Sequence, residues 1–217
     1  MWDPLWLSLR VTAWATGIVA VTGIGLGYLL ARSRFPGRGL LDAIATAPIV
    51  MPPTVLGYYL LVTVGRRSPI GQAWEAVFGS PLVFTWQGAV LAAVVASFPF
   101  CLRSARAAIE SVDRRFESAG RVMGLSEWRV AFQITLPLAR RGLLAGVALA
   151  FARALGDFGT TVMVAGNIPG RTQTMPVAVY DAVQAFDYDR AGTLALVLLA
   201  AALTVLMAVR RLERAVP

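Results

Sequence analysis

The stretch VTAWATGIVAVTGIGLGYLLA, residues 11–31, contains 21 residues without a single charge. A helix of about 20 apolar residues crosses the core of a bilayer, so this stretch predicts a membrane span that can begin as early as residue 5. Over the whole chain of 217 residues, 57% are hydrophobic and 15% are charged, whereas soluble domains carry about 25% charged residues. The composition therefore predicts an all-α membrane protein.

Four further stretches are almost free of charge and long enough to cross a bilayer. They predict about five spans within one transmembrane domain that covers residues 1–217, and the approximate bounds are 5–31, 43–65, 82–102, 142–165 and 191–209.

The distribution of arginine predicts how these spans are oriented. The chain has no lysine, so all 20 of its basic side chains are arginine. If the N-terminus is outside, 14 of the 20 lie in cytoplasmic segments, 5 lie outside and Arg153 lies within a span. The positive-inside rule therefore favours an outside N-terminus and a cytoplasmic C-terminus. The net charge of +8 is then mainly a surface for anionic lipid, and no motif supports nucleic-acid binding.

The missing residue types exclude several chemistries. A phosphate-binding P-loop needs a lysine, and a Ser–His–Asp triad or a histidine-bound metal needs a histidine, but the chain has neither lysine nor histidine and has one cysteine. We therefore expect no catalytic residue, no metal site and no cofactor bound by this chain. Any use of ATP would require a separate subunit.

The segment 113–137 joins the third and fourth spans on the predicted cytoplasmic side. Residues 113–123 have the spacing of a short amphipathic helix. Gly124 can end this helix in the left-handed conformation, and Ser126 with Glu127 can begin a second helix. Such a unit could lie on the lipid surface or dock into a groove of a partner protein.

The second half of this segment resembles the EAA loop of ABC importer permeases, in which a glycine is followed after nine residues by Ile-x-Leu-Pro. Gly124 and the residues 134–137 match that spacing, and Pro137 is also expected to interrupt the second helix. At the family's Glu-Ala-Ala position the chain has Ser118-Ala119-Gly120, and Glu117 precedes it by one residue. In the family this loop forms the coupling helix, which sits in a cleft of the ATPase subunit. The resemblance implies that the ATPase-coupling residues are Glu117, Ser118, Ala119, Gly120, Gly124, Leu125, Ser126, Trp128, Ile134, Leu136 and Pro137.

Three other segments resemble molybdate importer permeases: residues 48–58 (PIVMPPTVLGY), 152–159 (ARALGDFG) and 166–174 (GNIPGRTQT). The family usually has Glu at the position of Asp157. The resemblance implies a multi-pass permease of the bacterial inner membrane that is not itself an enzyme. It also implies a second copy of the chain, two cytoplasmic ATPase subunits that use ATP, and an extracytoplasmic molybdate-binding protein. The alternatives are a permease for tungstate or for sulfate and thiosulfate, and a gradient-driven secondary transporter, which would need no docking loop.

Three prolines within the predicted second span, Pro48, Pro52 and Pro53, have two possible roles. Pro52 and Pro53 each remove a backbone donor, and unpaired backbone groups at membrane depth are tolerated only against protein or a water-lined cavity. The prolines could therefore make a packing kink, or they could break a helix that lines the translocation path, with Thr54 and Tyr58 as lining groups.

Arg153 and Asp157 are opposite charges within the predicted fourth span, four residues apart, so they can pair on one helix face. Ionisable residues inside a membrane are functional candidates. The two residues could line the translocation path, or they could form a structural pair, because a carboxylate repels an oxyanion.

The polar loop 166–174 lies on the predicted outer side. It could contact the binding protein or form an outer gate, with Asn167, Arg171 and Thr172 as candidate contacts. Alternatively, it could only join the fourth span to a short re-entrant helix near residues 175–185.

Overall fold

The computed structural model describes the backbone of residues 2–215 and the side chains of residues 3–208 and 211. Within this part of the chain every regular element is helical, which confirms the predicted all-α class. In chain order the elements are α1 (Trp2–Arg32), α2 (Arg38–Thr46), the 3₁₀ turn η1 (Ala47–Ile49), α3 (Pro53–Val64), α4 (Pro69–Phe78), α5 (Trp86–Glu110), α6 (Arg114–Val122), α7 (Glu127–Val130), the π-helical turn η2 (Ala131–Thr135), α8 (Leu136–Leu155), α9 (Gly159–Ala165), α10 (Met175–Gln184) and α11 (Tyr188–Ala215).

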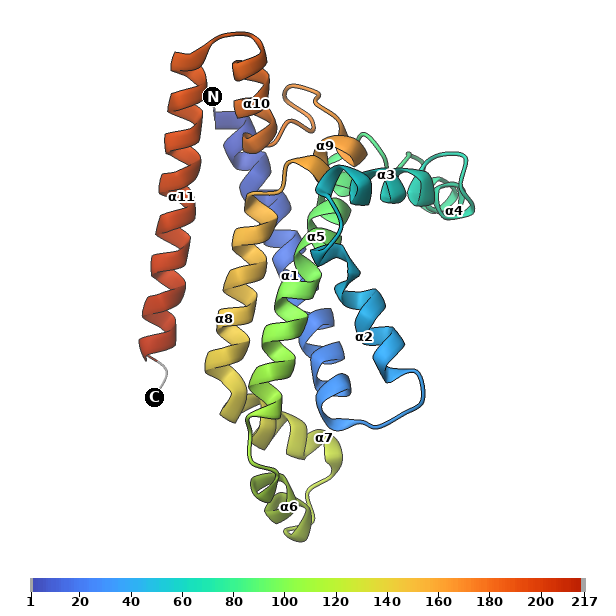
Figure 1. The fold of residues 1–217 in the computed structure, drawn as a ribbon, viewed down its shortest axis with the longest axis vertical. Helices are drawn as coiled ribbons and strands as arrows, with labels where there is room; N and C mark the ends of the chain where they lie inside the picture. The colour runs from blue at the N-terminus through green and yellow to red at the C-terminus, as the bar shows by residue number, and fades with distance from the viewer. Residues whose placement is uncertain (1, 216–217) are drawn as a thin grey trace.

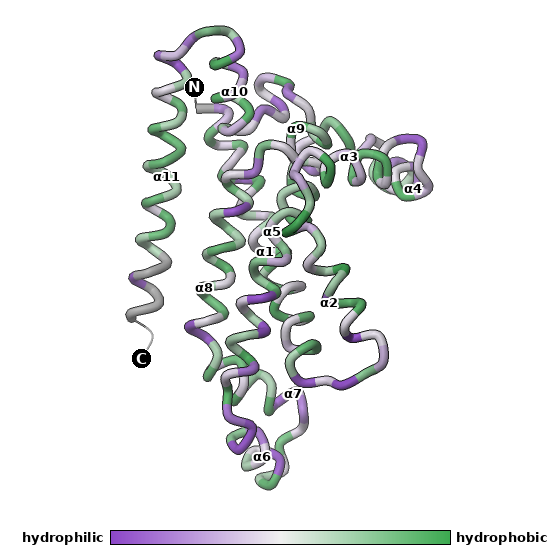
Figure 2. Tube along the Cα trace, in the orientation of Figure 1, coloured by the Kyte–Doolittle hydropathy of each residue, from purple (hydrophilic) through white to green (hydrophobic). Residues whose placement is uncertain are grey.

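Four helical stretches of the described chain are long and apolar enough to cross a membrane. A fifth crossing results if α2 with η1 and α3 are counted as one bent span, which agrees with the predicted number. The long helices run along the same axis of the molecule (Figure 1). Hydrophobic residues follow their length, and hydrophilic residues gather around α6 at one end and in the loops near α10 at the other (Figure 2).

Helix α5 lies at the centre of the packed helices. In the most apolar 18-residue stretch of each helix, the buried share is 61% for α5, compared with 28% for α1 and 11% for α11. Helix α5 packs against α1, α8 and α9, and small residues such as Ala15, Ala89 and Ala93 make the contacts near its start. Small side chains let helix backbones approach closely, which is how helices associate in lipid.

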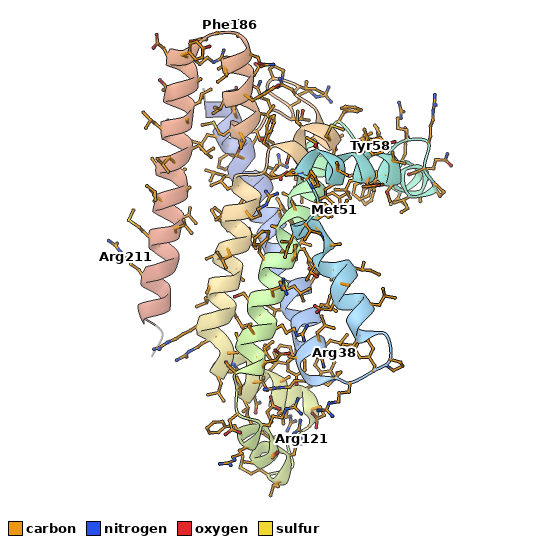
Figure 3. All side chains as sticks on the ribbon, in the orientation of Figure 1. Arg38, Met51, Tyr58, Arg121, Phe186 and Arg211 are labelled. Carbon is orange, nitrogen blue, oxygen red and sulfur yellow. The ribbon has the colours of Figure 1, made fainter. Side chains whose placement is uncertain are left out.

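The second span is broken by a bend of 115° between η1 and α3. Pro52 has the extended angles φ −55° and ψ 135°, as expected for a residue that precedes a proline, and Pro53 begins α3. Met51 marks the bend in Figure 3, and from there α3 runs across the direction of the long helices. The prolines thus break the span, so this segment is a broken helix rather than a continuous span over 43–65.

The fourth span also differs from its predicted bounds of 142–165. The helix is continuous from Glu127 to Leu155, and the chain then turns at residues 156–158 before the separate helix α9. The polar side chain of Asp157 stabilises this turn, because its carboxylate accepts the backbone N–H of Thr161, in the first turn of α9, at 2.9 Å. Helix α9 packs against α3 so closely that a Cβ on Gly57 would lie 2.6 Å from the Cβ of Met163.

The predicted short helix near residues 175–185 is α10, which packs beside the first part of α11. The start of α1 and the end of α11 lie at opposite ends of the molecule (Figure 1), as an odd number of crossings requires. Helix α6 lies at the same end as the end of α11. Arg210 and Arg214, two of the arginines used to predict orientation, fall outside the described side chains.

Candidate functional site

The segment that resembles a coupling loop begins with the predicted amphipathic helix. Helix α6 is capped by Asp113, whose side chain accepts the N–H of Arg115 at 2.9 Å. Gly124 ends it with φ +83°. The N–H of Leu125 donates to the carbonyl of Gly120 at 3.1 Å, and that of Gly124 to the carbonyl of Arg121 at 2.9 Å. This is the Schellman pattern of a glycine-terminated helix, so the predicted stop at Gly124 is confirmed.

The second half of the segment is more continuous than expected. Ser126 occupies the position before α7, although its side chain makes no capping hydrogen bond. Pro137 does not interrupt the helix, because the π-helical turn η2 directly precedes it and the chain stays helical into α8. Proline lacks the N–H of an ordinary helical residue, and π-helical turns, although rare, occur mostly as single turns inside α-helices.

The predicted coupling residues differ in their exposure. Glu117 and Gly120 are buried, and a Cβ on Gly120 would lie 2.5 Å from Cδ1 of Ile134, so this face packs against the following helix. Ser118, Ala119, Gly124, Ser126, Trp128 and Pro137 are exposed, and Leu125, Ile134 and Leu136 are half-buried.

Large apolar side chains cover the outer side of this segment. Trp128 is 76% exposed, and its ring stacks on that of Phe132 with centroids 6.2 Å apart. We call this surface the apolar patch, and its members are Phe116, Val122, Met123, Trp128 and Phe132. An exposed apolar patch beside charged residues is typical of a protein interaction surface.

Glu117 is turned inward, contrary to a direct role in contacting another subunit. Its Oε1 accepts Nε of Arg32 at 2.7 Å and the hydroxyl of Thr135 at 2.8 Å. Arg32 also donates from Nη2 to the carbonyl of Val112 at 3.0 Å. In the sequence Arg32 is one of the 14 arginines of the predicted cytoplasmic segments, and only its position at the end of the first span could have pointed to this role. On the exposed side, the hydrogen bond to Glu127 raises the pKa of Arg121 above its ordinary value.

A cavity of about 500 Å³ lies where the broken second span meets the end of α8. It is lined by Pro53, Thr54, Arg153, Gly156, Asp157, Phe158 and Gly159, and it therefore unites most of the residues predicted for a translocation path. Pro52 makes the bend beside it. Tyr58 lies farther along α3 (Figure 3), where it is exposed and contacts the ring of Tyr59 edge-on.

Arg153 and Asp157 form the predicted pair, with 2.9 Å between Nη1 and Oδ1. The carboxylate is 1% exposed and the guanidinium side chain is 27% exposed. The other carboxylate oxygen accepts both the N–H and the hydroxyl of Thr161, at 2.9 and 2.8 Å. Asp157 is therefore fully satisfied, and the partly open Arg153 is the member of the pair that can contact a solute in the cavity.

The outer loop is held together by its own polar groups. The amide of Asn167 donates to Asp181 at 2.9 Å, and Gln173 donates to Asn167 at 2.8 Å. The hydroxyl of Thr172 accepts the N–H of Ile168 at 3.1 Å, and Thr172 is buried. Thr172 therefore shapes the loop rather than presenting a contact, whereas Asn167 is exposed.

Arg171 lines a second cavity, of about 720 Å³, which residues of the connections on either side of α4 also line. Arg66 and Arg67 also line it, so the cavity is basic. Arg66 is partly neutralised by Glu75, with 2.6 Å between Nη2 and Oε1, and the hydrogen bond from Arg66 lowers the pKa of Glu75.

Known proteins share both this sequence and this fold. The family described as the binding-protein-dependent transport system inner membrane component matches residues 23–216. The molybdenum transport system permease protein ModB of Escherichia coli K12 is 48% identical over 84% of this chain and 80% of that protein. The sulfate transport system permease protein CysT of the same organism is 35% identical over 89% of this chain and 69% of that protein.

Solved structures agree on the fold. A chain of the MetNI methionine ABC transporter in an inward-facing conformation superposes with a TM-score of 0.79 at 20% identity, covering 100% of this chain and 97% of that one. A chain of a bacterial ABC transporter that imports alginate superposes with a TM-score of 0.78 at 14% identity, covering 98% and 78%. Together with the family match over almost the entire sequence, these similarities show that the chain belongs to the binding-protein-dependent transport system inner membrane components, the permease subunits of ABC importers.

Proposed function

We propose that two copies of this chain form the translocation path of an ATP-driven molybdate importer. Sequence identity supports molybdate as the substrate. The chain is 48% identical to the molybdenum transport permease of E. coli K12 and 44% identical to a putative molybdenum transport permease of Bacillus subtilis, whereas it is 35% identical to the sulfate permease CysT. The N-terminus lies outside and α6 in the cytoplasm, as the arginine distribution favours.

Energy comes from two cytoplasmic ATPase subunits, because this chain has no lysine with which to build a P-loop. The apolar patch on α6 and α7 is the surface that docks on them. Aromatic residues such as Trp128 are frequent anchors of protein interfaces, and this patch lies at the predicted cytoplasmic end.

The cavity beside Arg153 is part of the path. A tetrahedral oxyanion can accept hydrogen bonds from the guanidinium, while the carboxylate of Asp157 cancels much of its charge. Binding at this point is therefore weak, which suits passage and release. High-affinity capture is left to an extracytoplasmic binding protein, which contacts Asn167 and Arg171 on the outer loop.

The second copy completes the path, since five spans are too few to enclose one. Helix α2 has no buried residue and α3 is largely exposed, so the broken span has a free side for the partner. Isologous pairing about a two-fold axis is the commonest arrangement of oligomers.

The second candidate is a permease for sulfate, which the 35% identity with CysT favours, or for the related oxyanions thiosulfate or tungstate. Reconstitution of the permease with its ATPase and binding protein distinguishes the substrates. We expect molybdate and tungstate to stimulate ATP hydrolysis, and we expect Gly124→Arg to abolish the stimulation without loss of membrane insertion. Stimulation by sulfate alone would show that sulfate, and not molybdate, is the substrate. Failure to form an ATPase complex would overturn the importer and favour a gradient-driven transporter.

A further inference from the structure

The buried carboxylate of Glu117 joins three elements at the predicted cytoplasmic end. Glu117 itself belongs to α6, Arg32 is the last residue of α1, and Thr135 ends the π-helical turn η2 that leads into α8. Both partners meet the same carboxylate oxygen, at 2.7 and 2.8 Å. The side chains of Glu117 and Arg32 are only 3% and 10% exposed, so water screens the interaction little.

The Arg32 guanidinium makes two contacts in different directions. Besides Glu117 it holds the carbonyl of Val112 at 3.0 Å, which lies in the short connection between α5 and α6. The end of the first span therefore binds both the coupling helix α6 and the connecting segment that leads into it. By contrast, the backbone packing of α6 is mainly against α7 and η2.

We propose that the Arg32–Glu117 ion pair is a positioning device that carries movement of the coupling helix to the first span. Helix α6 moves together with α1 through Arg32 and together with α8 through Thr135. The inference rests on the proposed function, because movement of α6 is driven by the ATPase. Glu117 acts through these contacts and not by touching the ATPase, from which it is turned away.

Geometry favours transmission over a purely local role. A charge-assisted hydrogen bond is short and directional, so it resists displacement of α6 relative to the end of α1. Both members of the pair are also held by a further hydrogen bond: Arg32 donates to the carbonyl of Val112, and Glu117 accepts the hydroxyl of Thr135. The two charged groups are therefore already fixed in position. Loss of Arg32 leaves the buried carboxylate of Glu117 with only the longer, more exposed ion pair to Arg121, whose Nη2 lies 4.0 Å from Oε2; removing one partner of a buried pair is costly, whereas loss of an exposed pair costs little.

The test compares Arg32→Gln, Arg32→Lys and the neutral double variant Arg32→Gln with Glu117→Gln. Arg38→Gln is the matched control, because Arg38 pairs with Glu110 at 3.5 Å at the same end of the molecule but is more exposed. Each variant is reconstituted with the ATPase and binding protein. The readouts are assembly of the complex, stimulation of ATP hydrolysis by the loaded binding protein, and molybdate transported per ATP hydrolysed.

We expect Arg32→Gln and the double variant to assemble but to lose at least about fivefold of the stimulation, the lower end of allosteric coupling. Arg32→Lys should restore part of it, because lysine keeps the charge that pairs with Glu117 but lacks the planar fork that also reaches Val112, and Arg38→Gln should match the wild type. The double variant removes both charges, so it remains informative if Arg32→Gln alone fails to fold.

Stimulation within twofold of wild type in the assembled double variant would overturn the proposal, as would an equal loss in Arg38→Gln. A wild-type chain that forms no ATPase complex would instead overturn the proposed function, and the assembly readout identifies that outcome separately.

Discussion

Removal of the Asp157 carboxylate should be among the most damaging single changes in this chain. The side chain is 1% exposed and accepts three hydrogen bonds, one from Arg153 and two from Thr161. Asp157→Ala leaves the largely buried Arg153 without a counter-charge, and breaking a buried pair in this way costs about 3–5 kcal/mol.

Matched variants separate charge from hydrogen bonding. Asp157→Asn keeps the volume and one acceptor oxygen, so we expect a smaller loss of about 1.5–3 kcal/mol, the value of a hydrogen bond to a charged group. Asp189→Ala removes an exposed aspartate in the first turn of α11, and it should cost no more than about 1 kcal/mol. The free energy of unfolding is measured in mixed micelles through the fluorescence of the six tryptophans.

The double variant Arg153→Ala with Asp157→Ala provides the decisive comparison. It leaves neither charge uncompensated, so it should be less destabilised than the sum of the single variants, by about 0.5–3 kcal/mol for residues in contact. If the single effects instead add within about 0.5 kcal/mol, the two side chains do not stabilise each other and the reasoning is refuted.

Three further predictions test other parts of the structure. Gly124→Ala should lower the free energy of unfolding by about 1–2 kcal/mol, because φ is +83° at this position and alanine is strained in that left-handed conformation. No atom lies within 4 Å of the added Cβ, so the loss comes from the backbone angle and not from a clash. An unchanged melting temperature would contradict the left-handed turn. Trp128→Ala should leave stability unchanged within about 0.5 kcal/mol but weaken binding of the ATPase subunit about 30-fold, as for an interface hot spot; an unaltered affinity in a binding titration would remove Trp128 from the docking surface. Arg66→Gln should raise the pKa of Glu75 towards its ordinary value, measured by carboxyl NMR, because the hydrogen bond from Arg66 lowers it. A carboxyl pKa lowered by folding stabilises the protein above the unfolded-state pKa, and this contribution is lost as the pH falls through the folded-state pKa; a pKa of Glu75 that does not move in the variant would show that the two side chains do not pair in solution.

Local patterns were sufficient for much of the coupling segment. Asp113 and Gly124 bound α6 because capping depends on side chains and backbone angles close in sequence. The pairing of Arg153 with Asp157 was predicted from their spacing on one helix face; the pair forms, although Asp157 lies in the turn that follows α8. The helix near residues 175–185 was also predicted from local pattern, and it is α10.

Contacts between distant residues were not predictable in the same way. Thr135 and Arg32 lie 18 and 85 residues from Glu117, and no local periodicity connects them. Pro137 was expected to interrupt a helix, but the π-helical turn η2 precedes α8 and the chain stays helical through Pro137. The inward burial of Thr172 depends in the same way on how its loop folds back on Ile168.

The sequence by itself determined the class of the protein, because an apolar helix of bilayer length needs no partner to satisfy its backbone hydrogen bonds. It also determined the number of such stretches and the glycine that ends α6. Only the tertiary structure decided that the second span bends by 115°, that the fourth ends at Leu155, and that Glu117 faces Arg32 instead of a partner. These features depend on which helices pack together, and packing brings together charges and backbone groups whose separation in the sequence carries no periodic signal.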